Sequence, residues 1–181
     1  MSALKIARYG LLTSVMLVLG LVERQFLLVP GVPGIRLGLS NTVLLYALCL
    51  MDAKSAWLLM GLKVLLGGLL YAGVSGMFYS FAGGLLSMAA MLLALRVKGI
   101  GMAGISVMGA TAHMAGQLLM SRFLLGSWAA LAQAPILIVA AVVTGVLTGV
   151  SARAACKGVA SGNPDMRRRL EALDMDRGKE P

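Results

Sequence analysis

The stretch AKSAWLLMGLKVLLGGLLYAGVSGMFYSFAGGLLSMAAMLLAL, residues 53–95, decides the fold class of this chain. A helix needs about 20 mainly apolar residues to span a bilayer core of ~30 Å, so the stretch is long enough for two crossings. Only Lys54 and Lys63 are charged within it, and the glycines around residues 73–76 mark a break. We therefore expect two membrane helices, over residues 53–71 and 77–95.

The composition of the whole chain agrees with this interpretation. Of its 181 residues, 59% are hydrophobic and 13% are charged, and the mean hydropathy is +0.90. Soluble domains average roughly 45–50% apolar and about 25% charged residues. A soluble enzyme with a polar shell and a disordered chain are therefore both excluded. The two cysteines cannot form a disulfide scaffold, and we expect both to be free and buried.

Four further stretches are apolar enough for membrane helices: residues 6–22, 38–51, 101–120 and 135–152. The first is expected to be a retained span, because VERQ (22–25) is no small-residue cleavage site. The predicted fold is an all-α integral membrane protein, a compact bundle of six transmembrane helices over residues 1–157. Residues 158–181 are expected to form a polar cytoplasmic tail with room for a short amphipathic helix.

Basic residues indicate the orientation of the bundle, since cytoplasmic loops are enriched in Lys and Arg. With the N-terminus inside, seven basic residues of the helical part face the cytoplasm and three face outward. We therefore predict a multi-pass protein of the cytoplasmic membrane with both termini inside (N-in/C-in). The inner set is Lys5, Arg8, Lys54, Arg96, Lys98, Arg153 and Lys157, and the outer set is Arg24, Arg36 and Arg122.

The net charge of +9 does not indicate nucleic-acid binding. Residues 165–181 hold five basic and five acidic residues, so the whole excess belongs to the membrane part, with 11 basic and 2 acidic residues. Most of this positive excess consists of the basic residues that mark the cytoplasmic face. We therefore expect the lipid bilayer, but no nucleic acid, as a partner.

Small residues spaced four apart predict close contacts between helices in lipid. Ala141, Gly145 and Gly149 make two such steps in the last membrane helix. Packing within a compact bundle is the favoured interpretation, and a face for oligomer formation is the alternative.

Polar side chains within the membrane are the candidate functional residues, because an intramembrane charge costs roughly 2.5–3.5 kcal/mol on insertion scales. In the predicted topology they lie at the midplane or in the outer half, which favours a shared polar cavity that opens outward. The alternative is a set of unrelated groups, such as a Glu23–Lys63 pair and a His113 bonded to a carbonyl. The six candidate substrate-binding residues are Glu23, Arg36, Asn41, Lys63, His113 and Gln117.

The charges near this cavity favour an anionic small-molecule ligand. Arg36, Lys63 and Arg122 are opposed only by Glu23, and an excess of positive charge in a site of low dielectric constant is relieved by a phosphate, diphosphate or carboxylate group. The stretch PGVPG (30–34), which precedes Arg36, is either a lid over the site or a plain outer connector.

The sequence lacks the residues that catalysis would need. Prenyl or phosphoryl transfer through Mg²⁺ requires clustered carboxylates, yet Glu23 and Asp52 are the only acids outside the tail. A single His gives no zinc-binding spacing, and no phosphate-binding G-x-x-x-x-G-K-[ST] loop occurs. We expect no catalytic residues, no metal site and no cofactor, and hence a protein that is not an enzyme.

Five segments resemble the Gx transporter family, which is also catalogued as heptaprenyl diphosphate synthase component I. The resemblance runs in order over about residues 1–155. Lys63 stands where this family usually has Arg, and Met114 stands where Asn usually follows the His. The segments are PGIRLGLSN (33–41), LKVLLGGLL (62–70), FYSFAGGLLS (78–87), GATAHMAGQ (109–117) and VTGVLTG (143–149).

The resemblance implies a protein similar to the substrate-binding S-components of energy-coupling factor transporters. These bind vitamins or similar small molecules and work with a transmembrane coupling subunit and ATPases. The ligand expected here is then vitamin- or flavin-like, or prenyl-diphosphate-like. The synthase name implies the alternative: a non-catalytic membrane component beside a soluble prenyl synthase subunit, with a role in quinone side-chain synthesis.

Overall fold

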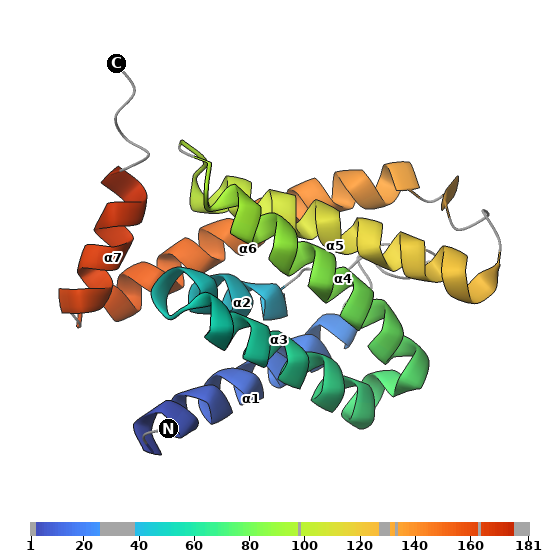
Figure 1. The fold of residues 1–181 in the computed structure, drawn as a ribbon, viewed down its shortest axis with the longest axis horizontal. Helices are drawn as coiled ribbons and strands as arrows, with labels where there is room; N and C mark the ends of the chain where they lie inside the picture. Colours follow the sequence, from blue (N-terminus) through green and yellow to red (C-terminus); the bar gives the residue numbers. More distant parts are fainter. Residues whose placement is uncertain are drawn as a thin grey trace.

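The computed structural model describes residues 3–25, 39–97, 99–126, 131–132, 134–162 and 164–175. These ranges contain helices and turns but no strand, which confirms the all-α prediction (Figure 1). In chain order the elements are α1 (Ala3–Gln25), α2 (Leu39–Leu50), α3 (Ala53–Gly67), the π-helix η1 (Gly68–Ala72), α4 (Gly73–Ala94), α5 (Met102–Leu125), α6 (Ala134–Ala160) and α7 (Pro164–Met175).

Three stretches of the described chain are long and apolar enough to cross a membrane: Ala3–Glu23, Ala53–Ala94 and Ala134–Ala160. The middle stretch alone holds 42 residues, which is enough for two crossings. The helix α2 is apolar but has only 12 residues. The chain is therefore a membrane protein, while the count of six crossings and their orientation stay predictions.

Large apolar side chains cover the outside of the helices rather than only the core. Phe123 on α5 is 81% exposed and Leu69 on η1 is 72% exposed. Apolar surface on this scale marks contact with a membrane or another protein. The outer surface of the bundle is suited to lipid.

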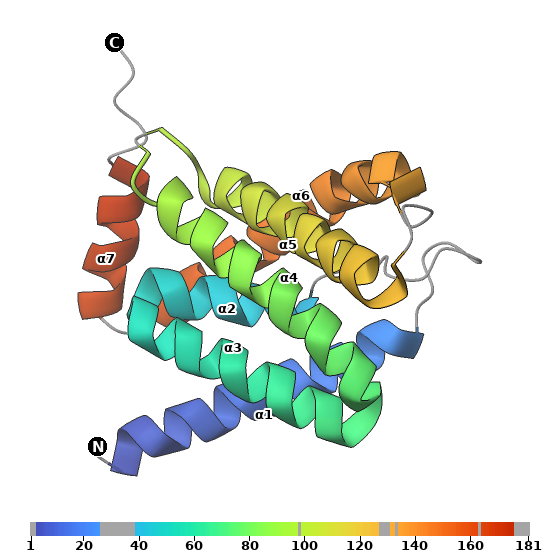
Figure 2. The ribbon, with the colours of Figure 1, turned by 45° about the vertical axis from the view of Figure 1, so that its right-hand side comes forward.

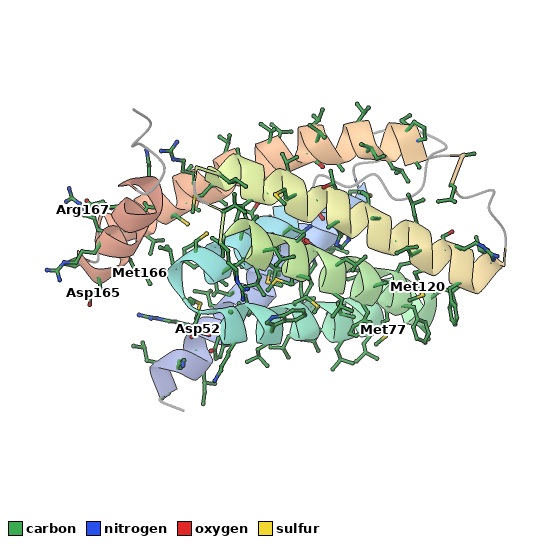
Figure 3. All side chains as sticks on the ribbon, turned by 45° about the horizontal axis from the view of Figure 1, so that its top comes forward. Asp52, Met77, Met120, Asp165, Met166 and Arg167 are labelled. Carbon is green, nitrogen blue, oxygen red and sulfur yellow. The ribbon has the colours of Figure 1, made fainter. Side chains whose placement is uncertain are left out.

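The two ends of the bundle can be followed in the figures. The start of α1 and the whole of α7 lie at the same end (Figures 1 and 2). Figure 3 shows Asp52 toward that end, on the side of Asp165 and Arg167 of α7, with Met77 and Met120 at the other. We call these the Asp52 end and the Met77 end.

A tight hairpin joins α3 to α4 through the π-helix η1. Gly73, the residue that follows η1, has φ of +70°, a conformation that glycine adopts without the steric cost of a Cβ. Met77 packs directly over Gly68, where a Cβ would overlap its side chain. The predicted break near residues 73–76 is thus a change of helix type followed by a glycine turn.

Close packing of α4, α5 and α6 depends on glycines at their contacts. A Cβ on Gly116 would lie 2.5 Å from the carbonyl oxygen of Ala82 on α4, and one on Gly145 would lie 2.7 Å from Cα of Val107 on α5. Backbone at these distances leaves no room for a side chain. The prediction that Gly145 packs within the bundle is confirmed.

The main core cluster draws buried residues from all seven α-helices, α1 to α7, and it includes the fully buried Met16, Leu59 and Met88. Cys49 and Cys156 are both buried, as predicted, and neither forms a disulfide with a described residue. The amphipathic helix α7 packs on α2 and α6 through Met166 and the buried Leu170. Part of the tail is therefore docked on the bundle rather than solvated.

Asp52 caps the N-terminus of α3, where its Oδ1 accepts a hydrogen bond of 2.6 Å from the backbone N–H of Ser55. Hydrogen bonds from the backbone and the side chain of Ser55 hold the pKa of Asp52 below its ordinary value. Burial opposes this shift, and the nearby Lys5 and Lys54 contribute less to it than burial does. Because the folded pKa is lowered, the stabilisation is present above the unfolded pKa of about 3.9 and is lost as pH falls through the folded pKa.

We expect Asp52→Ala to lower the free energy of unfolding by about 1 kcal/mol at pH 7, since the cap is removed. The difference from wild type should shrink when unfolding is measured below pH 4. Asp52→Asn keeps a good capping group and should stay near wild type at pH 7. An Asp52→Ala variant with wild-type stability at pH 7 would contradict the capping role.

Candidate functional site

A cavity of about 70 Å³ lies inside the bundle and is lined by residues from α1 to α6 and from η1. Five of the six predicted site residues line it: Glu23, Asn41, Lys63, His113 and Gln117. The sixth, Arg36, lies outside the described residues, as does the predicted lid or connector at residues 30–34. Side chains separated by up to 94 positions in the sequence thus share one cavity.

Glu23 joins the end of α1 to the start of α2. It is only 4% exposed, and its Oε1 accepts a hydrogen bond of 3.1 Å from the backbone N–H of Ser40. Ser40 is the second residue of α2, where N–H groups have no partner within the helix. The carboxylate also lies at the positive end of the α2 dipole. Glu23 is thus held by a helix terminus.

Lys63 lies in the interior of α3 and is half-buried at the cavity wall. Its Nζ donates a hydrogen bond of 2.6 Å to Oδ1 of Asn41, which comes from the first turn of α2. A short bond from an ammonium group to an amide oxygen fixes the position of the positive charge. The start of α2 therefore holds both Glu23, through its backbone, and Lys63, through a side chain.

His113 and Gln117 occupy one face of α5 and both line the cavity. The imidazole packs against Gly83 on α4, where a Cβ would lie 2.8–2.9 Å from three ring atoms. Glycine at position 83 therefore gives the ring the space that it occupies. This contact places His113 at the middle of α4, half a helix away from the Gly73 turn.

The π-helix η1 contributes Tyr71 to the cavity wall. The Tyr71 hydroxyl packs against two glycines. It would lie 2.6 Å from a Cβ on Gly20 of α1 and 3.1 Å from a Cβ on Gly67 of α3. Short π-helical segments occur frequently at functional sites. No sequence pattern predicted the π-helix, and Tyr71 was missed as a lining residue.

A group of hydroxyls at the Asp52-end half of the cavity was also missed as part of the site: Ser87 on α4, Ser106 on α5, and Thr144 and Thr148 on α6. All four are buried, with exposed fractions of 4–5%. The available signal was their position among small residues on faces that pack inside the bundle. Arg122, counted above among the positive charges, lies in the last turn of α5 and is not among the lining residues.

Lys63 and Glu23 are the charged side chains of the cavity lining within the described part of the chain. The carboxylate is bonded to the N-terminus of α2, and the ammonium is bonded to a neutral amide. These two hydrogen bonds connect both groups to the start of α2. No group of three His, Cys, Asp or Glu residues able to hold a metal ion occurs among the described residues.

The chain matches heptaprenyl diphosphate synthase component I over residues 12–155, which is most of its length. It belongs to the heptaprenyl diphosphate synthase component I family. No curated protein and no solved structure gives a significant match.

The match to heptaprenyl diphosphate synthase component I covers the cavity completely. The lining residues run from Gly20 to Thr148, and all lie within the matched residues 12–155. The docked helix α7, by contrast, lies outside that range. The part of the chain that defines the family is therefore the part that builds the cavity.

Proposed function

We propose that this protein is a substrate-binding and translocating subunit for a small anionic metabolite, similar in role to the S-components of energy-coupling factor transporters. It is a multi-pass protein of the cytoplasmic membrane and not an enzyme. A transmembrane coupling subunit and ATPases are the partners that such a role requires. The observation that carries the proposal is the polar cavity inside a membrane bundle, with the Lys63 ammonium at its wall.

The electrostatics of the cavity support an anionic ligand. The negative charge of Glu23 is directed at the backbone N–H of Ser40 and at the α2 dipole. Lys63 meets an uncharged oxygen of Asn41, so its positive charge is not cancelled by that contact. A ligand carboxylate or phosphate would gain a charge-assisted hydrogen bond from Lys63. Asn41, His113 and Gln117 would orient it, and Arg36 is proposed as a second cationic group.

The binding test uses inorganic pyrophosphate as the probe, with purified protein in nanodiscs and isothermal titration calorimetry. Lys63→Met keeps the apolar stem of the side chain but removes its charge, and we expect pyrophosphate affinity to fall at least tenfold. A charge-assisted hydrogen bond is worth about 1.5–3 kcal/mol, which corresponds to that loss or more. Lys63→Arg should stay within a few fold of wild type, because it keeps the charge.

Lys54→Met is the matched control, because Lys54 is an exposed residue of the same helix and its loss changes the net charge equally. We expect it to bind pyrophosphate as the wild-type protein does. Equal affinities for the Lys63→Met and Lys54→Met variants would show that the cavity ammonium binds no anion.

The family name favours one second function: a non-catalytic membrane component of a heptaprenyl diphosphate synthase. In that case a soluble prenyl synthase subunit should co-purify with the protein, and deletion of the gene should remove quinone side chains. Lys63→Met should leave both results unchanged, because a docking surface for a soluble subunit lies outside the cavity.

A further inference from the structure

The cavity follows one face of α5 over three turns. Its lining includes Ser106, Gly109, His113 and Gln117, which recur at the spacing of a single helix face. Eleven residues separate Ser106 from Gln117, so the two side chains lie about 16 Å apart along the axis. The cavity therefore has two distinct levels, one near Gln117 and one near Ser106.

The ammonium group belongs to the Gln117 level. A Cβ on Gly84 of α4 would lie 3.0 Å from Sδ of Met60 on α3, which sets these two residues side by side. Lys63 follows Met60 by about one turn toward η1, and η1 leads directly into the start of α4. Lys63 thus lies nearer to the Met77 end than the Met60–Gly84 contact does. Gly83 and its neighbour His113 are displaced from that contact in the same direction.

Four hydroxyls from three helices define the Ser106 level. Ser87 lies against Gly109, with its Oγ 3.3 Å from the position of a Cβ, and Ser106 lies against Gly149, with its Cβ at 3.0 Å. The α4–α5 contact thus fixes the position of Ser87, and the α5–α6 contact fixes that of Ser106. Ser87 is one helical turn, about 6 Å, beyond Gly83 and its neighbour His113.

Two of these hydroxyls already donate to their own helix. Thr144 Oγ1 bonds to the carbonyl of Ala141 at 3.4 Å and Thr148 Oγ1 bonds to the carbonyl of Thr144 at 2.7 Å. A hydroxyl group that donates still has lone pairs with which it can accept a hydrogen bond. The Ser87 and Ser106 hydroxyls make no hydrogen bond with any of the described residues, although both side chains are at least 95% buried.

Hydroxyls without a protein partner are disfavoured in an interior, and at the wall of a cavity they are satisfied by a polar guest or by water. Along the helix axes Ser87 lies about 6 Å and Ser106 about 10 Å from the level of the cavity imidazole, within reach of the same small molecule. The lining at this level offers both hydroxyl donors and hydroxyl acceptors but no charged side chain. Such a surface recognises an uncharged hydroxyl, amide or carbonyl group.

We propose that the Ser87–Ser106 hydroxyls form a second subsite for an uncharged hydrogen-bonding group of the ligand whose anionic group is bound at Lys63. This rests on the proposed function and narrows the substrate class to a small anion that is polar at both ends. A prenyl diphosphate does not fit, because its apolar chain would leave these hydroxyls unpaired.

The test compares two phosphate monoesters of similar size and equal charge, sn-glycerol 3-phosphate and pentyl phosphate. Affinities are measured by calorimetry in nanodiscs, beside inorganic pyrophosphate. We expect glycerol phosphate to bind at least tenfold tighter than pentyl phosphate. The double variant Ser87→Ala/Ser106→Ala should remove most of this preference and leave pyrophosphate affinity unchanged.

Folding of the double variant is checked by its thermal midpoint, which should equal or exceed that of wild type because no hydrogen bond is lost. Ser14→Ala, at an exposed position on α1, is the matched control and should keep the preference. Pentyl phosphate binding as tightly as glycerol phosphate, or binding of pyrophosphate without either ester, would overturn the subsite and leave the anion site standing. Failure of all three probes would overturn the proposed function itself.

Discussion

Gly149→Leu is expected to destabilise the bundle by about 3 kcal/mol or more, so that little folded protein is recovered in detergent. A Cβ at position 149 would lie 2.6 Å from Cα of Ala103 and 3.0 Å from the carbonyl oxygen of Met102. These neighbours are backbone atoms of α5, which no rotamer change can move aside. Helix association in lipid depends on such close packing, since lipid supplies little hydrophobic driving force between helices.

The measurement is thermal unfolding followed with a thiol-reactive fluorogenic dye, because Cys49 and Cys156 are buried and react only on unfolding. Gly149→Ala should lower the free energy of unfolding by about 1–3 kcal/mol, the usual cost of overpacking. Gly158→Leu is the control: it lies on the same helix, is exposed, and a Cβ there would have no neighbour within 4 Å. A Gly149→Ala variant that unfolds at the wild-type temperature would refute the contact.

The helices were predictable because each depends on composition over a long window. The expected stretches 53–71 and 77–95 correspond to α3 with η1 and to α4, with ends that differ by a few residues. The contact of Gly149 with α5 was predictable for a related reason, since small residues four apart share one helix face. What these predictions share is that the deciding residues are close in sequence.

The site was predictable only for residues whose chemistry is costly in lipid. Lys63 and His113 stood out because an ionisable group inside an apolar helix needs a compensating contact. Ser87 and Ser106 did not, because a serine in a membrane helix commonly bonds to its own backbone and carries no signal by itself. Their role depends on how α4, α5 and α6 pack, which the local sequence does not specify.

The partner of Glu23 was likewise beyond local reasoning. The sequence suggested a Glu23–Lys63 pair as one alternative. In the structure the carboxylate is bonded to the backbone N–H of Ser40, and the geometry depends on how α1 ends beside α2. Docking of α7 through Leu170 was unexpected for the same reason, because a short apolar face reveals its partner only in the folded bundle.

Glu23→Ala is expected to lower the free energy of unfolding by about 2–3 kcal/mol. Ser40 is only 3% exposed, so its backbone N–H is buried, and without the Glu23 carboxylate this N–H has no acceptor from α1. Loss of a hydrogen bond to a charged group costs about 1.5–3 kcal/mol, and the favourable interaction with the α2 dipole is lost as well. The same dye-based unfolding experiment measures the effect.

Two variants separate the hydrogen bond from the charge. Glu23→Gln keeps an oxygen acceptor, so it should recover part of the stability lost in Glu23→Ala, and the remaining deficit measures the interaction of the charge with the helix dipole. Ser40→Ala keeps the backbone N–H and should unfold close to the wild-type temperature. If Glu23→Ala were as stable as Ser40→Ala, the carboxylate would not be capping α2, and Glu23 would instead be available to offset the charge of Lys63. The proposed preference for an anion depends on that distinction, because Glu23 and Lys63 are the charged side chains of the described lining, and a carboxylate held at the N-terminus of α2 leaves the ammonium to meet a ligand.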